Sequence, residues 1–517
     1  MLRYSRSWLL GLVLSLCASI AQAVPAPEDV VMYEVNLRAF SQAGDLAGVT
    51  ARLDNIQSLG ANTLWLMPIH PVGQVNSVGG LGSPYSIMDY GVVSSEYGSL
   101  SDLTTLVTEA HSRGMFVLMD WVGNHTAWDH PWITTHPDWY SQNGQGEIIH
   151  PPGTNWQDVA DLNYDSAAMR SAMISEMQYW VADVGIDGFR VDAADFVPYD
   201  FWEQAIPAVR GATERPLLML AEGARDDHYA AGFDLTWGFS FFTAVERVFN
   251  SSRPATDLVF RHNQEFSSIP AGKSILRYTT NHDESAWNAT PPDLFGGLDA
   301  SLAAYAAVVA YGATPLVYNG QEIGWSENVP IFSKSPLDWN TGQVTEAWYS
   351  QLLAVHNNHP ALRAGSIDDR SNNNIAMLMR KTAEDQVLVL VNTRDFTSSI
   401  QIPTEWQGEW FDLLTDNAEQ LTALFSLDPY EVLYLSPTPS GQPGDFDLDG
   451  DVDGADFLAW QRGVSTNPPS ASDLVDWQDF YSSSTPLSAR SSAIPEPSAL
   501  LLGVLAILTG LAARRRL

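Results

Sequence analysis

The stretch GFRVDAADF (residues 188–196) places Arg190 and Asp192 two positions apart in an otherwise apolar run. Such a run is typical of a β-strand, and side chains two positions apart lie on the same face of a strand. Two interpretations fit the pair. It is either a buried structural ion pair or a catalytic carboxylate beside the cation that keeps it charged. The rest of the chain decides between them.

Other short apolar segments alternate with stretches of helical pattern. One landmark in each expected strand is Tyr33, Trp65, Asp120, Asp192, Glu222, Asp283 and Tyr318. This alternation predicts parallel strands joined by crossover helices. Most successive landmarks lie one or two units of roughly 31 residues apart, the length of a βα unit in an eightfold barrel. The double interval places one further strand near FDLTWGF (233–239).

The two longer intervals, from Trp65 to Asp120 and from Asp120 to Asp192, indicate insertions. The interval between Asp120 and Asp192 holds about 40 residues more than a βα unit needs, which predicts a small inserted domain over 126–163. The expected fold of 28–360 is therefore a (β/α)8 TIM barrel of the α/β class, with this domain after its third strand. Strand-like runs separated by turns then predict a C-terminal antiparallel β-sandwich domain over 361–436. A Pro/Gly/Ser linker follows over 437–444.

Both ends of the chain resemble targeting segments. Residues 1–23 combine arginines, an apolar run and the sequence AQA, as a secretory signal peptide does. Cys17, the only cysteine, lies in this leader, so the exported chain is expected to have neither a disulfide nor a thiolate site. Near the other end, an apolar run precedes three arginines, which favour a cytoplasmic location for that end. The bulk of the chain is expected to be exported, to the cell envelope or the extracellular space.

The composition argues against one class of partner. The formal charge is −35 at pH 7, and the phosphates of a nucleic acid would be repelled by such a surface. Neutral ligands such as sugars stay compatible with it.

Polar side chains gather where the expected strands end, which is the edge that carries the catalytic groups of TIM barrels. The residues at these positions are Asp120, Asn124, His125, Arg190, Asp192, Glu222, His282 and Asp283. Each could be structural by itself. Carboxylates that end three separate strands, beside two histidines and an arginine, favour a catalytic site.

Four ordered motifs resemble the signatures of the α-amylase family, glycoside hydrolase family 13. They are DWVGNH (120–125), GFRVDAADF (188–196), LAEG (220–223) and TTNHD (279–283). Further motifs of the family are matched by GSPYSIMDY (82–90), VADLN (159–163) and GATPLVYNGQE (312–322). The resemblance extends over residues 28–436. It implies an enzyme that cleaves α-1,4-glucosidic bonds of starch-like glucans or maltooligosaccharides with retention of configuration.

The resemblance also assigns residue roles. It makes Asp192 the nucleophile, Glu222 the general acid/base and Asp283 the group that stabilises the transition state. Substrate contacts are assigned to Tyr85, His125, Arg190 and His282. An oxocarbenium-like transition state needs one carboxylate below the anomeric carbon and one acid above the leaving oxygen. Arg190 is expected to keep Asp192 ionised, while an apolar strand end favours the protonated form of Glu222.

The chain departs from the family pattern on the leaving-group side. The second signature often carries Lys and His three and four positions after the nucleophile, where this chain has Asp195 and Phe196. This departure leaves the exact substrate and the glycosyl acceptor open. Many members of the family also bind a structural calcium ion between the barrel and the inserted domain. Asn124 and Asp161 occupy the matching positions.

A second calcium motif lies beyond the β domain. DFDLDGDVDGAD (445–456) has the spacing of a calcium loop, with glycine at position 6 and a backbone carbonyl contributed by position 7. Its expected ligands are Asp445, Asp447, Asp449, Asp451, Asp453 and Asp456. Residues 445–482 resemble a dockerin with an incomplete second repeat, which implies a cohesin-like partner. An acidic solvated linker is the alternative.

Residues 494–517 resemble the PEP-CTERM sorting signal, with PEP at 495–497, an apolar helix and an arginine cluster. This resemblance implies processing by a sorting peptidase of the cell envelope. A lasting transmembrane tail anchor is the alternative.

Three functions are open at this point. The first is an exported glucan hydrolase of the α-amylase type. The second is a transglycosylase or disaccharide-rearranging enzyme that uses the same residues. The third is a non-catalytic glucan-binding surface protein, which the presence of both Asp192 and Glu222 disfavours.

Overall fold

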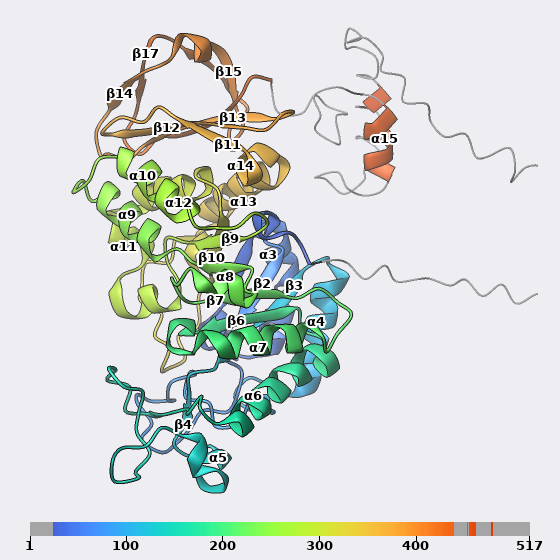
Figure 1. Cartoon of the computed structure of the whole chain (residues 1–517). Coiled ribbons are helices and arrows are strands. Elements are labelled where there is room, and N and C mark those ends of the chain that lie inside the picture. The colour runs from blue at the N-terminus through green and yellow to red at the C-terminus, as the bar shows by residue number, and fades with distance from the viewer. Residues whose placement is uncertain (1–23, 439–451, 453, 462–476, 479–517) are drawn as a thin grey trace, which may run out of the picture. The chain divides into compact units, whose positions relative to one another are not determined.

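Eight parallel strands close into a barrel. The structure is a computed structural model that describes residues 24–438, 452, 454–461 and 477–478. The chain divides into two compact units, Met1–Pro439 and Ser440–Leu517, and the barrel lies in the first (Figure 1). Its strands are β1 (Met32–Val35), β2 (Thr63–Leu66), β3 (Phe116–Val122), β6 (Gly188–Asp192), β7 (Leu218–Ala221), β8 (Leu235–Trp237), β9 (Ser274–Arg277) and β10 (Thr314–Tyr318).

The strands follow one another around the barrel in sequence order, and β1 closes it by pairing with both β2 and β10. Six of the seven landmarks lie in their strands or directly after them, Asp283 lies six residues after the end of β9, and FDLTWGF contains β8. The predicted (β/α)8 barrel is confirmed. Because the strands are parallel, their C-terminal ends meet at one rim, where the following loops can build a single site.

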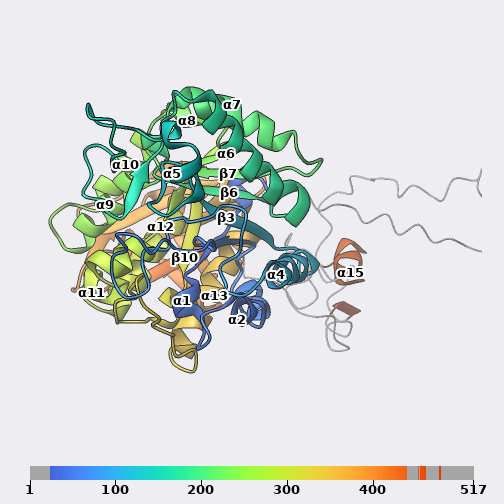
Figure 2. The same cartoon turned by 90° about the horizontal axis from the view of Figure 1, so that it is seen from below.

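Helices surround the strands (Figure 2). They are α1 (Leu37–Phe40), α2 (Leu46–Thr50), α3 (Leu53–Ser58), α4 (Leu100–Ser112), α6 (Ala167–Tyr179), α7 (Tyr199–Arg210), α8 (Asp227–Ala231), α9 (Phe239–Phe249), α10 (Thr256–Phe266), α11 (Pro291–Phe295), α12 (Leu298–Ala310), α13 (Gln343–Asn358) and α14 (Pro360–Ala364). In α4, Ser99 and Asp102 cap the first turn reciprocally, and buried residues recur every three or four positions. This spacing gives α4 one apolar face, which packs on β3.

The predicted inserted domain leaves the barrel directly after β3. It begins with β4 (His125–Ala127), which pairs antiparallel with β5 (Val159–Asp161). Between these strands the chain forms α5 (Pro131–Thr135) and irregular loops. In this pairing His125 lies opposite Asp161. The inserted domain therefore begins at the rim of the barrel where the C-terminal ends of the strands meet.

The C-terminal domain consists of antiparallel sheets, as predicted. Six strands form one sheet, namely β11 (Ser366–Asp369), β12 (Ile375–Lys381), β13 (Gln386–Asn392), β18 (Val432–Ser436), β15 (Gly408–Asp412) and β16 (Ala418–Leu421). A second sheet pairs β14 (Ser398–Gln401) with β17 (Leu424–Leu427). Alternate residues of β12 belong to two different cores. This double burial explains the continuous apolar run of β12.

Helix α12 joins the barrel to the β domain. It contacts both β12 and β13, and all but three of its side chains are buried. Its many alanines allow the sheet to approach closely. Tyr434 Oη donates a hydrogen bond to the carbonyl of Ala306 (2.6 Å), and Arg380 Nη1 donates one to the carbonyl of Ala310 (2.9 Å). The barrel and the β sheets therefore share one continuous core.

Several predicted segments lie outside the described residues. These are the leader, most of the linker, the acidic ligands from Asp445 to Asp453 and the tail at 494–517. In the second unit the structure describes α15 (Gly454–Gln461), in which the Asp456 side chain is buried. Among the described residues, no helix has both the length and the apolar character that a membrane span requires.

Gly188 tests the packing of the barrel. It opens β6 with φ +144°, and an added Cβ would lie 1.8 Å from the carbonyl oxygen of Leu218 on β7. Gly188→Ala is expected to lower the free energy of unfolding by about 2 kcal/mol or more, because the backbones of β6 and β7 must separate. Guanidinium unfolding followed by far-UV circular dichroism measures the change. Gly144→Ala, where nothing lies within 4 Å of the added carbon, is the matched control, and equal midpoints for the two variants would contradict the expectation.

Candidate active site

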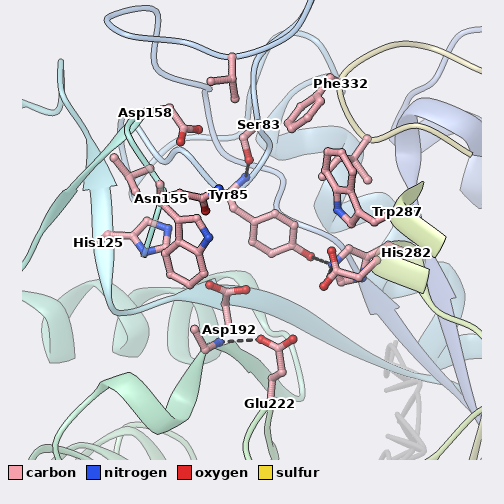
Figure 3. A pocket seen from close by; sticks show the side chains of 16 residues that line it. Ser83, Tyr85, His125, Asn155, Asp158, Asp192, Glu222, His282, Trp287 and Phe332 are labelled. Atoms are coloured by element: carbon pink, nitrogen blue, oxygen red, sulfur yellow. Dashed lines mark hydrogen bonds and ion pairs between the residues drawn. The ribbon is translucent and has the colours of Figure 1, made fainter. Parts of the chain in front are cut away.

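A cavity of about 480 Å³ lies where the loops after the barrel strands converge (Figure 3). Six of the predicted site residues line it, namely Tyr85, His125, Asp192, Glu222, His282 and Asp283. Asp192 ends β6, Glu222 follows β7, and Asp283 lies in the segment after β9. The closed barrel thus brings together side chains that are far apart in the sequence.

The seventh predicted residue, Arg190, is fully buried and contacts three carboxylates. Its Nη1 lies 2.9 Å from Asp120 Oδ1 and 3.1 Å from Asp192 Oδ1. Its Nη2 lies 3.0 Å from Glu222 Oε1 without the alignment of a hydrogen bond. The Arg190–Asp192 pair therefore fits both interpretations given for it. It is a buried ion pair, and its carboxylate also faces the cavity.

Aromatic rings enclose the guanidinium of Arg190. Its central carbon lies 4.8 Å from the ring centroid of Trp65, 5.3 Å from that of Trp237 and 5.8 Å from that of Tyr85. The ring faces attract the cation and exclude water. Charges in such surroundings interact more strongly than charges in water.

A left-handed turn connects the two central carboxyl groups. Ala193 follows Asp192 with φ 43° and ψ 43°, a conformation that costs an L-residue roughly 1–2 kcal/mol. In this turn the Ala193 N–H donates a hydrogen bond to Glu222 Oε2 at 2.7 Å. The strained turn after Asp192 thus directs the Ala193 N–H at the carboxylate of Glu222.

Burial raises the pKa of both central carboxyls. The pKa of Glu222 rises to about 7 through desolvation, against the opposing effect of Arg190. Desolvation also raises the pKa of Asp192, again opposed by Arg190 and reinforced by the charge of Asp120. The prediction that Arg190 keeps Asp192 ionised needs correction, because Arg190 lowers the pKa of Asp192 but contacts both carboxyls, and desolvation outweighs its effect. The charge of Asp192 also raises the pKa of Glu222, so ionisation of Asp192 favours the protonated form of Glu222.

His282 is held by a residue that the motifs did not indicate. Its Nδ1 lies 2.5 Å from Oε1 of Glu34 on β1, and its Nε2 lies 2.7 Å from Tyr85 Oη. Burial lowers the pKa of His282, but the carboxylates of Asp283 and Glu34 outweigh it and raise the pKa to about 9. The imidazole therefore carries a positive charge at neutral pH. The available signal was an acidic residue inside the apolar run around β1.

His125 has the opposite electrostatics. Burial lowers its pKa to about 4, so the ring is neutral at neutral pH. Its Nδ1 lies 3.2 Å from the side-chain nitrogen of Asn124. A neutral ring that accepts this hydrogen bond at Nδ1 carries its proton on Nε2. The site thus contains one charged and one neutral imidazole.

Aromatic side chains that the motifs did not indicate line the cavity on two sides. Trp156 of the inserted domain packs 5.5 Å from the His125 ring. Trp287 is 62% exposed and lies 5.4 Å from Phe332. Figure 3 shows His125 and Trp287 on opposite sides of Tyr85. Exposed aromatic faces beside convergent polar groups are typical of a site for a ligand with both apolar and hydroxyl-bearing faces.

The predicted calcium ligands of the barrel lie together on a separate cavity of about 270 Å³. Asn124 and Asp161 line it with Asn163 and Asp165, which gives an all-oxygen donor set of the kind that Ca²⁺ prefers. Burial raises the pKa of Asp161 and outweighs the opposing effects of a hydrogen bond from Ser141 and of the charge of His150. Within the described residues, however, no three His, Cys, Asp or Glu side chains are grouped as metal ligands. The kind of donor fits calcium, and backbone carbonyls or water would have to complete the ligand set.

Comparisons with known proteins agree with this geometry. The family profile described as "Alpha amylase, catalytic domain" matches residues 29–373. The alpha-amylase MalA of Haloarcula japonica is 26% identical over 74% of this chain and 58% of its own length. The trehalose synthase of Thermus thermophilus is 26% identical over 80% of this chain and 56% of its own length. The chain therefore spans little more than half of these two relatives.

A solved structure covers the same region. The crystal structure of an alpha-amylase from Lactobacillus plantarum has a TM-score of 0.73 and 28% sequence identity, and the match covers 79% of this chain and 99% of that protein.

Glu34→Gln is expected to lower the pKa of His282 from about 9, because the amide removes one of the two carboxylates that raise it. NMR titration of histidine labelled with carbon-13 measures the shift, and loss of a signal in His282→Asn assigns it. The folded-state pKa exceeds the ordinary 6.5. The stability gained from protonation is therefore fully present below pH 6.5 and is lost as the pH rises through 9.

Wild type should consequently lose more stability across that interval than Glu34→Gln. An unchanged titration of His282 in Glu34→Gln would show that the buried pair does not set its charge.

Proposed function

The chain belongs to the alpha-amylase catalytic-domain family, and we propose that it is a retaining glycoside hydrolase of α-1,4-linked glucans or maltooligosaccharides. One observation carries this proposal. Asp192, Glu222 and Asp283, contributed by three different strand ends, line one cavity, and Arg190 contacts the first two. This arrangement also argues against a non-catalytic binding protein, which would need no such set of carboxyl groups.

In the proposed first step, the Asp192 carboxylate attacks the anomeric carbon and Glu222 donates its proton to the leaving oxygen. Proton loss from Glu222 leaves a charge that Arg190 Nη2 and the Ala193 N–H face directly. In the second step, Glu222 takes a proton from a water molecule whose oxygen attacks the anomeric carbon, and the bond from that carbon to Asp192 breaks. A pKa of about 7 for Glu222 suits this alternation between acid and base.

The remaining polar groups suit a sugar ring between them. The neutral His125 provides an N–H donor for hydroxyl groups, and His282, whose two nitrogens face Glu34 and Tyr85, places a positive charge beside them. Asp283, whose side chain is 49% exposed, is free to accept hydrogen bonds from hydroxyls. Tyr85 presents its ring in the same cavity. Such groups become most effective as positive charge develops on the ring in the transition state.

We further propose that this enzyme is exported, with 1–23 as its leader and 494–517 as a sorting signal read by an envelope peptidase. Residues 445–456 are proposed to bind calcium and to belong to a dockerin-like module with a cohesin-like partner. Composition and ligand spacing support these proposals. A calcium ion at Asn124 and Asp161 would be structural, since neither residue lines the cavity that holds the carboxyl pair.

A transglycosylase is the second candidate, and an aromatic pair on the leaving-group side of the site favours it. Phe196 is 53% exposed there and lies 5.6 Å from Trp156. This aromatic pair offers an apolar face, on which a sugar can bind in preference to water. A relative named trehalose synthase is of similar identity to those named alpha-amylase.

Substitution of the two central carboxyls tests the proposed function. Asp192→Asn is expected to lower kcat on maltotriose by about 10³-fold or more, because the covalent intermediate cannot form. Glu222→Gln is expected to lower kcat on maltotriose by about 10²–10⁴-fold. It should retain far more activity on a 2-chloro-4-nitrophenyl α-glycoside, whose leaving group needs no proton. An inverted first product, detected by proton NMR, would refute the assignment of Asp192.

Product analysis distinguishes hydrolysis from transfer. Maltotriose should give mainly maltose and glucose in a hydrolase, whereas longer saccharides or trehalose would indicate transfer. Phe196→Ala should raise the ratio of hydrolysis to transfer, because it removes the apolar face that an acceptor sugar would use. Anion-exchange chromatography measures both quantities. Transfer products that dominate at low substrate concentration would overturn the assignment as a hydrolase.

A further inference from the structure

Asp195 binds the loop that follows Glu222. Its Oδ2 accepts a hydrogen bond from the Ala224 N–H at 3.0 Å, and its Oδ1 accepts one from the Arg225 N–H at 3.3 Å. The same Oδ1 lies 2.6 Å from Nε2 of His228, a residue that is 1% exposed. One carboxylate thus holds three points of the segment 223–228.

Further hydrogen bonds join the two segments, and one of them has its donor in the turn after Asp192. Arg225 Nη1 donates to the carbonyl of Asp195 at 2.9 Å and to that of Val197 at 3.2 Å. The Ala194 N–H donates to the carbonyl of Glu222 at 2.9 Å. The turn after Asp192 and the loop after Glu222 therefore form one hydrogen-bonded unit.

Close packing leaves this unit little freedom. An added Cβ on Gly223 would lie 2.4 Å from Asp195 Oδ1 and 2.5 Å from His228 Nε2. Gly223 directly follows Glu222, so the carboxylate and imidazole pack against the backbone that carries the acid. A side chain at this position would separate them.

The turn that Asp195 anchors is the strained one. Ala193 is left-handed and donates its N–H to Glu222 Oε2. Such a backbone conformation persists only where its surroundings hold it. Asp195, two residues later, supplies bonds that offset the strain.

We propose that Asp195 is a positioning residue that fixes the carboxyl group of Glu222 against the leaving oxygen. It acts through the bonded loop 223–228 and the Ala193 turn, without contact with the sugar. This inference rests on the proposed role of Glu222 as the acid. Many family members have a lysine at this position, on the leaving-group side. Asp195 would have a different function, because its carboxylate is hydrogen-bonded to the loop 223–228.

Graded leaving groups provide the test. Asp195→Ala is expected to lower kcat by about 10–100-fold on phenyl α-maltoside, with a smaller change in KM, because a misaligned acid protonates the leaving oxygen poorly. The loss should shrink on 4-nitrophenyl α-maltoside and shrink further on the 2-chloro-4-nitrophenyl compound. Asp195→Asn keeps one acceptor oxygen and should lie between wild type and Asp195→Ala. An equal loss on all three substrates, or a change in KM alone, would overturn the proposal.

A double-mutant cycle tests the route through His228. The losses caused by Asp195→Ala and His228→Ala should be less than additive, because each substitution breaks the same contact. Additive losses would exclude that route. Asp200→Asn is the matched control, since this aspartate is 62% exposed and pairs with Arg170 away from the loop. Thermal unfolding shows whether each variant is folded. If Asp195→Ala does not fold, the dependence of the kcat loss on the leaving group is measured with the near-isosteric Asp195→Asn instead.

Glu222→Gln on the same three substrates separates the two proposals. A loss in Glu222→Gln that does not depend on the leaving group would contradict the role of Glu222 itself. A dependence in Glu222→Gln that is absent in Asp195→Ala would leave the proposed function intact and refute only the positioning role.

Discussion

The buried guanidinium of Arg190 is the group around which the rim of the barrel is organised. It contacts Asp120 from β3, Asp192 from β6 and Glu222 after β7. A cation in this position would be strongly destabilising without these partners, and the carboxylates would be equally unfavourable without it. The same contacts of Arg190 therefore align three neighbouring strands and set the electrostatics of the cleft. Desolvation raises the pKa values of the two central carboxyls, and Arg190 opposes this rise at both.

A second constraint links the two carboxyl groups through the backbone. The left-handed Ala193 directs its N–H at Glu222, and Asp195 holds the same turn against the following loop. Strain in such a place is stable only because packing on both sides opposes its relaxation. The orientation of the Glu222 carboxyl group thus depends on main-chain geometry as well as on its own side chain.

Closure of the barrel supplies the third element. Glu34 on β1 and His282 after β9 are separated by most of the catalytic domain, and they meet because β1 pairs with β10 beside β9. Their contact keeps the imidazole charged, whereas His125 across the cavity is neutral. The inserted domain contributes Trp156 beside His125. The cavity is thereby lined by two imidazoles of different charge and by aromatic faces.

The sequence by itself determined the barrel, its insertion and the seven residues that converge on the cleft. It did so because strand periodicity is local and because the motifs lie at strand ends, which a parallel barrel must bring to one rim. Only the tertiary structure decided that Arg190 serves two carboxyls, that Glu34 charges His282 and that Asp195 holds the loop after Glu222. These contacts join residues about 30 to 250 positions apart. Their electrostatic effect depends on desolvation, which no local pattern specifies.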